Sequence, residues 1–431
     1  MRVFLACVLC SAATNLFAEV KTMTLREAVD LALRQNSDIT LARLDEQKAK
    51  YGVSIARDPF SPRIYAGSGI GYNYGIPQSV DGATPSIIQA RASMALYNRP
   101  TSFRATQAKE GERGAQIEVL RQQDEVAYRT ASLYLSAEQT IRAAELQRKQ
   151  LDSLEKVRST IQARVKEGRE LAIEDKKAEL TSARARHRLT ELEADQELLE
   201  SDLAMVLGLS TSDRVRPAGE DRGTLPTPVS EDESIAQALE SSKEIKALES
   251  KMQAKSLETK SYLAERYPKI DLLSSYALLA KFNNYEDYFR KFQRHNWQVG
   301  LSVSVPLLVP PSARAYASQS EVEVTRLRTQ INQVRHKVTT DIRSAFHGMR
   351  KHESARDLAK LDLEVAREQV NILIARYEEG RSPFRELEEA RIAESEKWTA
   401  YFSSQSNVER AKLDLLRHTG TLTAALSAAE K

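Results

Sequence analysis

Two long stretches without proline are the feature that most constrains how this chain can fold. No proline lies between residues 100 and 217 or between residues 311 and 383. Because a proline inside a helix costs about 3 kcal/mol, these are the stretches in which long helices can form. Apolar residues recur there every three or four positions, as in a coiled-coil seam, for example Leu151, Leu154, Val157, Ile161 and Val165. One helix over Thr101–Val165 would be about 100 Å long, so the sequence predicts an elongated, mainly helical fold.

A different period marks four short segments near the prolines. One segment alternates apolar with polar or small residues and includes Trp297, Val299, Leu301, Val303 and Val305. Ile88–Leu96 repeats the pattern, and Ile64–Tyr74 and Ile270–Leu279 are weaker versions. Alternation of this kind is typical of strands with one apolar face. We therefore predict four strands in two pairs, joined by polar connectors over 76–86 and 280–296.

The sequence also repeats itself. AVDLALRQNSDI from Ala28 resembles SIAQALESSKEI from Ser234, and at the same spacing Pro62-Arg63-Ile64 matches Pro268-Lys269-Ile270. ARVKEGR, which contains Gly168, matches ARYEEGR, which contains Gly380. From there Ala178, Asp202, Leu203 and Gly208 match, without a gap, Ala390, Asp414, Leu415 and Gly420. This register predicts two copies of one unit: helix, strand, loop, strand, long helix, turn and helix.

The first residues predict a secretory signal peptide. Arg2 precedes an apolar run over Val3–Ala13, and the small Ala18 lies at a suitable cleavage position. Both cysteines, Cys7 and Cys10, lie in this segment, so the mature chain would have no disulfide and no thiolate site. The predicted organisation is as follows: signal peptide 1–18; first structural repeat 19–230, with strands at about 63–97, a hairpin at about 101–208 and a linker at 209–230; second structural repeat 231–420, with strands at about 269–308 and a hairpin at about 312–420; tail 421–431.

Composition excludes several classes of protein. Charged residues make up 29% of the chain and the mean hydropathy is −0.47, which excludes a polytopic helical membrane protein. The 63 Lys and Arg are nearly balanced by 60 Asp and Glu, so the chain offers no case for nucleic-acid binding.

Only helices and closed barrels span a bilayer. Four strands are too few for a barrel, which needs about eight, so they form either a small soluble sheet or a share of a barrel built from several copies. Aromatic residues near the predicted strand ends favour the second alternative: Tyr72, Tyr74, Tyr97, Tyr276, Phe282 and Trp297.

Over nearly the whole mature chain the sequence resembles the TolC-type outer-membrane efflux proteins. The resemblance lies in MTLREAVDLALRQN from Met23, the entries at Pro62 and Pro268, SVSVPL from Ser302, and RYEEG from Arg376. It implies a mainly α fold with a membrane β portion, in which long antiparallel hairpins accompany four strands per protomer. Three protomers would share a twelve-stranded barrel in the cell outer membrane and form an α-barrel tunnel in the periplasm.

The resemblance also implies a passive exit duct for an efflux pump or a type I secretion system. Its partners would be a periplasmic adaptor, an inner-membrane transporter and outer-membrane lipid. The periplasmic mouth would be narrowed by a ring of Glu386 and Glu389, in which three copies of each carboxylate repel one another and attract cations.

A latch between Tyr377 and Glu174 would hold the mouth closed. Ser382 replaces the arginine that usually completes this latch, and Arg381 and Arg385 are nearby substitutes. The hairpin tips expected to dock the adaptor are Gly168, Arg169, Gly380, Arg381 and Pro383. Because an arginine follows each glycine, the contact would be charged or differ from that of the family.

Nothing in the sequence indicates an enzyme, a cofactor or a metal site. His347 and His352 are five residues apart and do not share a helix face as metal ligands would. The GSGIG run at Gly67 lies in a strand and lacks the helix that follows a dinucleotide loop. The alternatives to a duct are a soluble periplasmic coiled-coil adaptor or scaffold and an exported hydrolase. Duplicated strand pairs speak against the first, and the lack of a nucleophile or metal cluster speaks against the second.

Overall fold

The computed structural model describes residues 20–69, 86–210, 212–219, 226, 230–279, 293–308, 310–379 and 381–428. The predicted signal peptide, most of both strand connectors, and Tyr72, Tyr74 and Phe282 lie outside these residues. The chain divides into two compact units. Unit 1 comprises Met1–Thr40, Arg121–Ser242 and Lys337–Lys431, and unit 2 comprises Leu41–Leu120 and Lys243–His336. Each unit therefore combines segments from both halves of the sequence.

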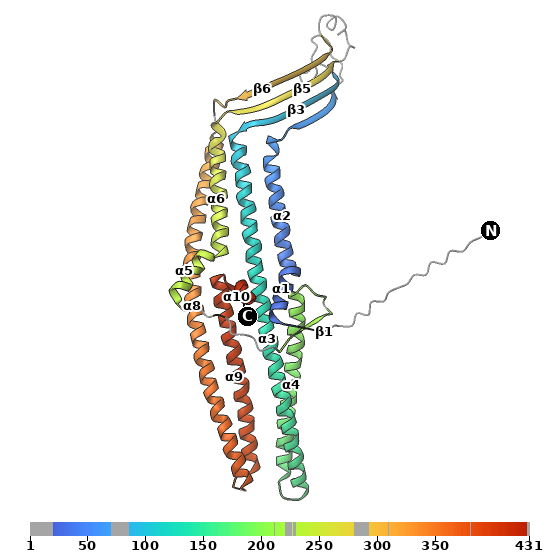
Figure 1. Ribbon diagram of the computed structural model, residues 1–431, viewed down its shortest axis with the longest axis vertical. Helices are drawn as coiled ribbons and strands as arrows, with labels where there is room; N and C mark the ends of the chain where they lie inside the picture. Colours follow the sequence, from blue (N-terminus) through green and yellow to red (C-terminus); the bar gives the residue numbers. More distant parts are fainter. Residues whose placement is uncertain are drawn as a thin grey trace, which may run out of the picture. The chain divides into compact units, whose positions relative to one another are not determined.

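Unit 2 contains one antiparallel sheet in the order β2-β3-β5-β6 (Figure 1). The strands are β2 (Arg63–Gly69), β3 (Ser86–Asn98), β5 (Lys269–Leu279) and β6 (His295–Ser304). The four predicted strands are thus present, and the pairing of β3 with β5 joins the two predicted pairs into one sheet. Within the described residues, β2 and β6 each pair on one side only, so the sheet has two open edges.

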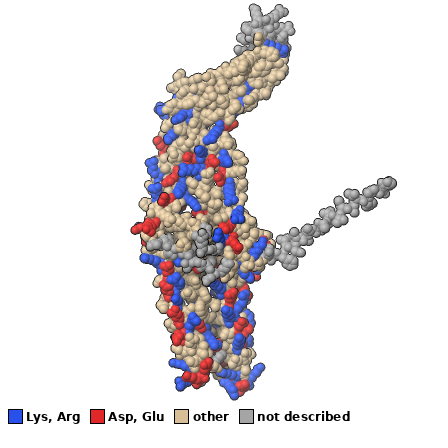
Figure 2. Space-filling view, in the orientation of Figure 1, with Lys and Arg blue, Asp and Glu red and all other residues tan. Residues whose placement is uncertain are grey.

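One face of this sheet is apolar and uncovered in the single chain. On β6, Trp297, Val299 and Leu301 are all exposed, and the strand contains no Lys, Arg, Asp or Glu. Charged side chains cover the helices of unit 2 but are sparse over its sheet (Figure 2). Burying such a face in water-free surroundings is favourable by about 25 cal/mol per Å². The surface of the sheet is therefore suited to contact with apolar surroundings on this face.

The helices of unit 2 pack closely through serines. Ser250 donates from its hydroxyl to the carbonyl of Glu110 at 2.7 Å, and Ser261 donates to the carbonyl of Pro100 at 3.1 Å. Small side chains at these contacts allow two helices to approach without a large cavity.

The long helices α3 and α8 each have residues in both units. The helices are α2 (Ser37–Arg57), α3 (Arg99–Lys166), α6 (Lys243–Leu263) and α8 (Pro311–Glu378).

Unit 1 contains the hydrophobic core and the helical hairpins. Tyr134, Leu203, Ile342, Leu413 and Leu415 are fully buried members of three apolar clusters. They hold together α3 and α8 with the shorter helices α1 (Leu25–Gln35), α4 (Ala172–Val206), α5 (Glu231–Ser241), α9 (Phe384–Thr419) and α10 (Leu422–Ala428). Helix α10 lies in the segment that the sequence predicts as a tail. The predicted mainly helical fold class with four paired strands is confirmed. No described helix is long and apolar enough to span a membrane.

Two short strands of unit 1 were not predicted. β1 (Val20–Met23) pairs in parallel with β4 (Arg214–Pro217), which lies within the predicted linker. The Tyr134 hydroxyl lies 3.0 Å from the carbonyl of Met23 and 3.2 Å from that of Ala218, at the end of this pair. Strands of four residues are too short to show a period of two, so only the fold reveals them.

Asn36 sets the break between α1 and α2. Its Oδ1 accepts from the backbone N–H of Asp38 at 2.8 Å, and so caps the start of α2. Its Nδ2 donates to the carbonyl of Val206 at 2.8 Å, where α4 ends. A single buried amide therefore ends one helix, starts the next and fixes both against α4.

The order of elements repeats along the chain, and the helices of the two hairpins repeat with constant spacing. α3 and α8 each have 68 residues and begin at Arg99 and Pro311, which are 212 positions apart. α4 and α9 begin at Ala172 and Phe384, again 212 positions apart. The two hairpins therefore align from the start of the first helix to the start of the second without an insertion in either copy.

Candidate functional site

The two hairpins of unit 1 close with turns built in the same way. Gly168 has φ +71°, a left-handed conformation that ends α3 as predicted. The N–H of Arg169 donates to the carbonyl of Arg164 at 2.9 Å, and the N–H of Arg381 donates to that of Arg376 at 2.8 Å. These bonds satisfy carbonyls at the ends of α3 and α8. Gly380 lies outside the described residues.

An exposed arginine lies at each tip. Arg169 pairs with Glu167 at 3.2 Å, and Arg381 pairs with Glu379 at 3.1 Å. Both arginine side chains are 77% exposed. Exposed ion pairs of this kind contribute at most about 1 kcal/mol, so a partner with a suitable carboxylate can displace them at little cost.

The predicted ring residues lie in the first turns of α9. Pro383 is the residue before the helix, and Glu386 and Glu389 follow on one face of it, both exposed. The Ser382 hydroxyl donates to Glu386 at 2.7 Å. Arg385 donates to Glu389 at 2.8 Å, and this contact raises the pKa of the Arg385 guanidinium. Each carboxylate is thus fixed by a residue four positions before it.

Glu174 is placed beside Arg385. The ammonium of Lys177 donates to Glu174 at 2.8 Å, and this bond, with a smaller effect of the Arg385 charge, lowers the pKa of the Glu174 carboxyl. Of the two arginines near Ser382, Arg381 is engaged by Glu379, and Arg385 is the one whose charge reaches Glu174. Tyr377 lies in the last turn of α8. The latch between Tyr377 and Glu174 stays a prediction.

Glu388 is a residue of this region that sequence reasoning missed. It is buried, and Arg391 donates to it at 3.1 Å. Burial raises the pKa of the Glu388 carboxyl, and the Arg391 charge opposes this only in part. It shares a pocket of about 220 Å³ with Trp398 of α9 and with Leu146 of α3. A glutamate among many glutamates gives no signal of burial, so the sequence alone could not single it out.

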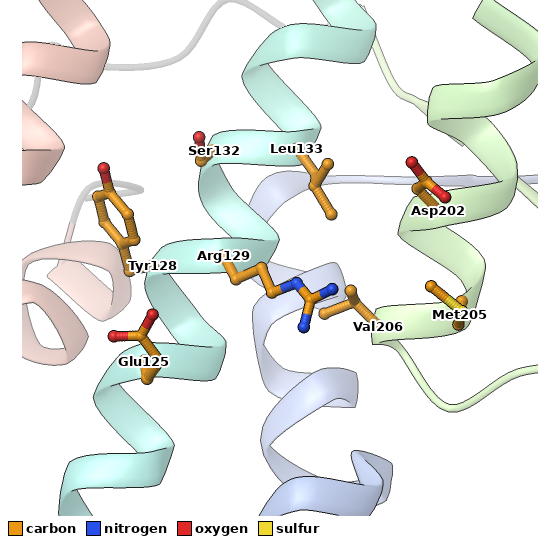
Figure 3. A pocket seen from close by; sticks show the side chains of 8 residues that line it. All are labelled: Glu125, Tyr128, Arg129, Ser132, Leu133, Asp202, Met205 and Val206. Carbon is orange, nitrogen blue, oxygen red and sulfur yellow. The ribbon is translucent and has the colours of Figure 1, made fainter.

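A second pocket, of about 270 Å³, lies between α3 and α4 (Figure 3). Its lining side chains are Glu125, Tyr128, Arg129, Ser132, Leu133, Asp202, Met205 and Val206. The Arg417 guanidinium lies 4.5 Å from the centre of the Tyr128 ring and donates to Glu125 at 2.8 Å. Burial, followed by the charge of Asp414, raises the pKa of the Tyr128 hydroxyl. These contacts tie α9 to α3 and present no nucleophile with a base.

Among the described residues no group of three or more His, Cys, Asp and Glu side chains is placed to hold a metal ion. The features that the structure does bring together are two hairpin tips of equal construction and, just behind one of them, a set of carboxylates and arginines on α4 and α9. These helices therefore present exposed charged side chains at the tips and directly behind them.

Residues 234–426 match the sequence model of the family described as outer membrane efflux protein. No curated protein sequence matches the chain. Among solved structures, the fold is similar to that of the outer membrane protein VceC of Vibrio cholerae, with a TM-score of 0.74 and 14% identity over 92% of this chain and 96% of that chain.

Two further solved structures have the same fold. The CmeC outer membrane channel of Campylobacter jejuni matches with a TM-score of 0.76 and 13% identity over 92% of this chain and 86% of that chain. The open state of the MtrE outer membrane channel of Neisseria gonorrhoeae matches with a TM-score of 0.72 and 17% identity over 92% and 88%. Residues 234–426 thus match the model of the outer membrane efflux protein family, and over more than nine tenths of its length the chain has the fold of these solved structures.

Proposed function

We propose that this protein is a trimeric channel of the outer membrane that serves as the passive exit duct of an efflux pump or a type I secretion system. The observation that carries the proposal is the β2-β3-β5-β6 sheet, which has an exposed apolar face and, in the part of the chain that the structure describes, two open edges. A sheet edge in a bilayer leaves backbone groups without partners, so the edges must close. In a trimer, β6 of one copy would pair with β2 of the next, and lipid would cover the apolar face.

The helices would extend this barrel into the periplasm, and the hairpin tips would lie at its far end. There Arg169 and Arg381 would contact a periplasmic adaptor, which in turn joins an inner-membrane transporter. Both arginines are exposed and only weakly paired, which supports a charged contact with acidic side chains of the adaptor. The docking would draw the tips apart and open the mouth.

Glu386 and Glu389 would form the ring that narrows the closed mouth. Three copies of each carboxylate around one axis favour cations over anions. Arg385, whose charge acts on Glu174, would take over in the latch the role of the arginine that Ser382 replaces. Opening would then move Arg385 of α9 away from Glu174 of α4.

Reconstitution into planar bilayers tests this proposal. We expect a small, cation-selective conductance that rises in the double variant Glu386→Ala/Glu389→Ala, because the charged side chains no longer close the mouth. The matched control is Glu396→Ala, an exposed glutamate further along α9, which should leave the conductance unchanged. Anion-selective current that the double variant does not alter would contradict the ring assignment.

Membrane extraction tests the rest of the proposal. The protein should require detergent for extraction and should elute as a trimer before denaturation. A freely soluble monomer would contradict the channel itself, whatever the charge of its helices.

A further inference from the structure

The pocket that contains Glu388 lies between α3 and α9, within unit 1 of a single chain. Much of its wall is apolar, with Leu146 and Leu154 from α3 and Ile392 and Trp398 from α9. Its volume is about 220 Å³. An apolar cavity of about 150 Å³ takes up one benzene molecule. This pocket therefore has room for one aromatic ring with a short side arm.

Glu388 places a carboxylate at the buried end of the pocket. Among the described side chains that line it, only Glu388 and Leu154 are buried. Arg391 donates to Oε1 of Glu388 at 3.1 Å, and no described residue donates to Oε2. A buried carboxylate is costly unless its charge is compensated and its oxygens accept hydrogen bonds. Glu388 is thus only half satisfied by the chain itself, which leaves one oxygen for a ligand.

The other charged side chains of the lining lie closer to solvent. The Arg391 side chain is 44% exposed, and Lys149 is also exposed. Glu394, which is half-buried, adds a second negative charge to the same lining. Exposed charges are screened by water and salt, whereas a buried charge is screened much less. The buried carboxylate therefore decides which charge a ligand can bring to the inner end of the pocket.

Trp398 forms an aromatic wall whose orientation is fixed. Phe402 stacks on its ring with 5.3 Å between the ring centres, and the Arg367 guanidinium lies 5.6 Å from the ring centre. The rest of the indole surface lines the pocket. Aromatic rings attract one another in offset or edge-to-face arrangements, so a ligand ring beside this indole gains more than the burial of its area.

We infer that this pocket is a binding site for a small protonated amine that carries an aromatic ring. The ammonium would donate to Oε2 of Glu388, and the ring would lie against Trp398 and Leu146. A hydrogen bond between an ammonium and a carboxylate is about twice as strong as one between neutral groups. The site belongs to one chain and does not depend on the proposed trimer. A bound amine would contact both α3 and α9, and so would link the two hairpins of that chain.

The fluorescence of Trp398 in the full chain, purified in a non-ionic detergent, tests this site. The chain contains two tryptophans, and Trp297→Phe leaves Trp398 as the only one. The probe is 2-phenylethylamine, and we expect it to change the Trp398 emission with a saturable dependence on concentration. 3-Phenylpropanoate, which has a similar ring and arm but a negative charge, should give no saturable change.

Variants of α9 separate the contribution of charge from that of space. Glu388→Gln keeps the size of the side chain and removes its charge, and should weaken amine binding by about tenfold or more. Ile392→Phe fills the pocket without a change of charge and should abolish the saturable response. Glu396→Gln, on the exposed part of the same helix, should bind the amine as tightly as the parent. The same is expected of Glu386→Ala/Glu389→Ala, because both of these carboxylates are exposed and neither lines the pocket.

The outcomes distinguish this site from the proposed function. Equal amine affinity in the parent and Glu388→Gln, or saturable binding of 3-phenylpropanoate with similar affinity, would overturn the site. Loss of amine binding in Glu386→Ala/Glu389→Ala would place the amine at those carboxylates and overturn it as well. A conducting trimer without a saturable response would overturn the site alone. A soluble monomer that binds the amine through Glu388 would contradict the channel and leave the site in place.

Discussion

Gly168 and Gly208 have the same left-handed backbone in different surroundings. Their φ angles are +71° and +75°. A Cβ added to Gly168 would meet nothing within 4 Å, whereas one added to Gly208 would lie 2.7 Å from the carbonyl oxygen of Gln35. The left-handed conformation alone costs a non-glycine residue about 1–2 kcal/mol.

We therefore expect Gly168→Ala to lower the free energy of unfolding by about 1–2 kcal/mol, which is the cost of the conformation alone. Gly208→Ala should cost clearly more, because the α1 backbone must also move away. Thermal unfolding followed by circular dichroism measures both variants, and Gly168→Ala is the matched control. Equal losses of unfolding free energy in the two variants would show that the close approach of residue 208 to the Gln35 carbonyl does not add to the cost of the substitution.

Glu388 makes stability depend on pH in a defined direction. Burial raises the pKa of its carboxyl, so the folded protein binds this proton more tightly than the unfolded protein does. The contribution of this group to the free energy of unfolding is therefore greatest at low pH and falls as the pH rises from the usual carboxyl value of 4.5 through the raised one. Glu388→Gln removes the titration.

We expect the melting temperature of Glu388→Gln to exceed that of the parent at neutral pH. The gap should shrink as the pH falls below the raised pKa, where the parent carboxyl is also neutral. Melting curves over a pH series measure this gap, with Glu396→Gln as the control on the exposed part of the same helix. A variant that is less stable than its parent at neutral pH would show that the Arg391 contact outweighs burial.

At the scale of elements, the pair of β1 and β4 depends on one side chain from the long helix α3. The Tyr134 hydroxyl lies within hydrogen-bond distance of the carbonyls of Met23 and Ala218, and the rest of the ring is buried in the core. Removing one such hydroxyl costs about 1 kcal/mol.

Tyr134→Phe keeps the ring and removes the hydroxyl. We expect a loss of about 1 kcal/mol in the free energy of unfolding, and faster amide hydrogen exchange that is confined to 20–23 and 214–218. Mass spectrometry of exchanged peptides measures this, with peptides from α9 as the internal control. Unchanged exchange in β1 would show that backbone pairing with β4 holds the strand without Tyr134.

The same elements show what a sequence can and cannot specify. The long helices and the strands with alternating patterns were predicted because their periods run over many residues, as in Trp297–Val305. β1 and β4 were missed because four residues carry no readable period. The tips were predicted from repeated glycines, and the pair of Arg385 with Glu389 follows the i,i+4 spacing of a single helix. The effect of Arg385 on Glu174, in contrast, joins residues of α9 and α4 that are far apart in the sequence. Such contacts between distant segments are set by packing and not by local pattern.

At the scale of the whole molecule, the apolar face of the sheet determines which side of the strands would contact lipid. Along β6, Val299 and Leu301 lie on the exposed apolar face, and Gln298 lies on the other face, with its register fixed by pairing to Ser275. A strand slipped by one residue would exchange the two faces. The structure thus specifies which side of each strand would meet lipid in the proposed barrel.

Val299→Arg and Gln298→Arg place the same charge on neighbouring positions of opposite faces. An arginine on the lipid face of a barrel costs about 2–4 kcal/mol near the middle of the bilayer, whereas one facing the lumen stays in water. We expect Val299→Arg to reduce the amount of trimer recovered from the outer membrane, and Gln298→Arg to leave it near the parent level and to shift ion selectivity toward anions. Recovery on native gels after membrane fractionation and bilayer recordings measure both effects. If Gln298→Arg were the variant lost from the membrane, the strand would face lipid with its polar side, and the barrel would need the opposite register.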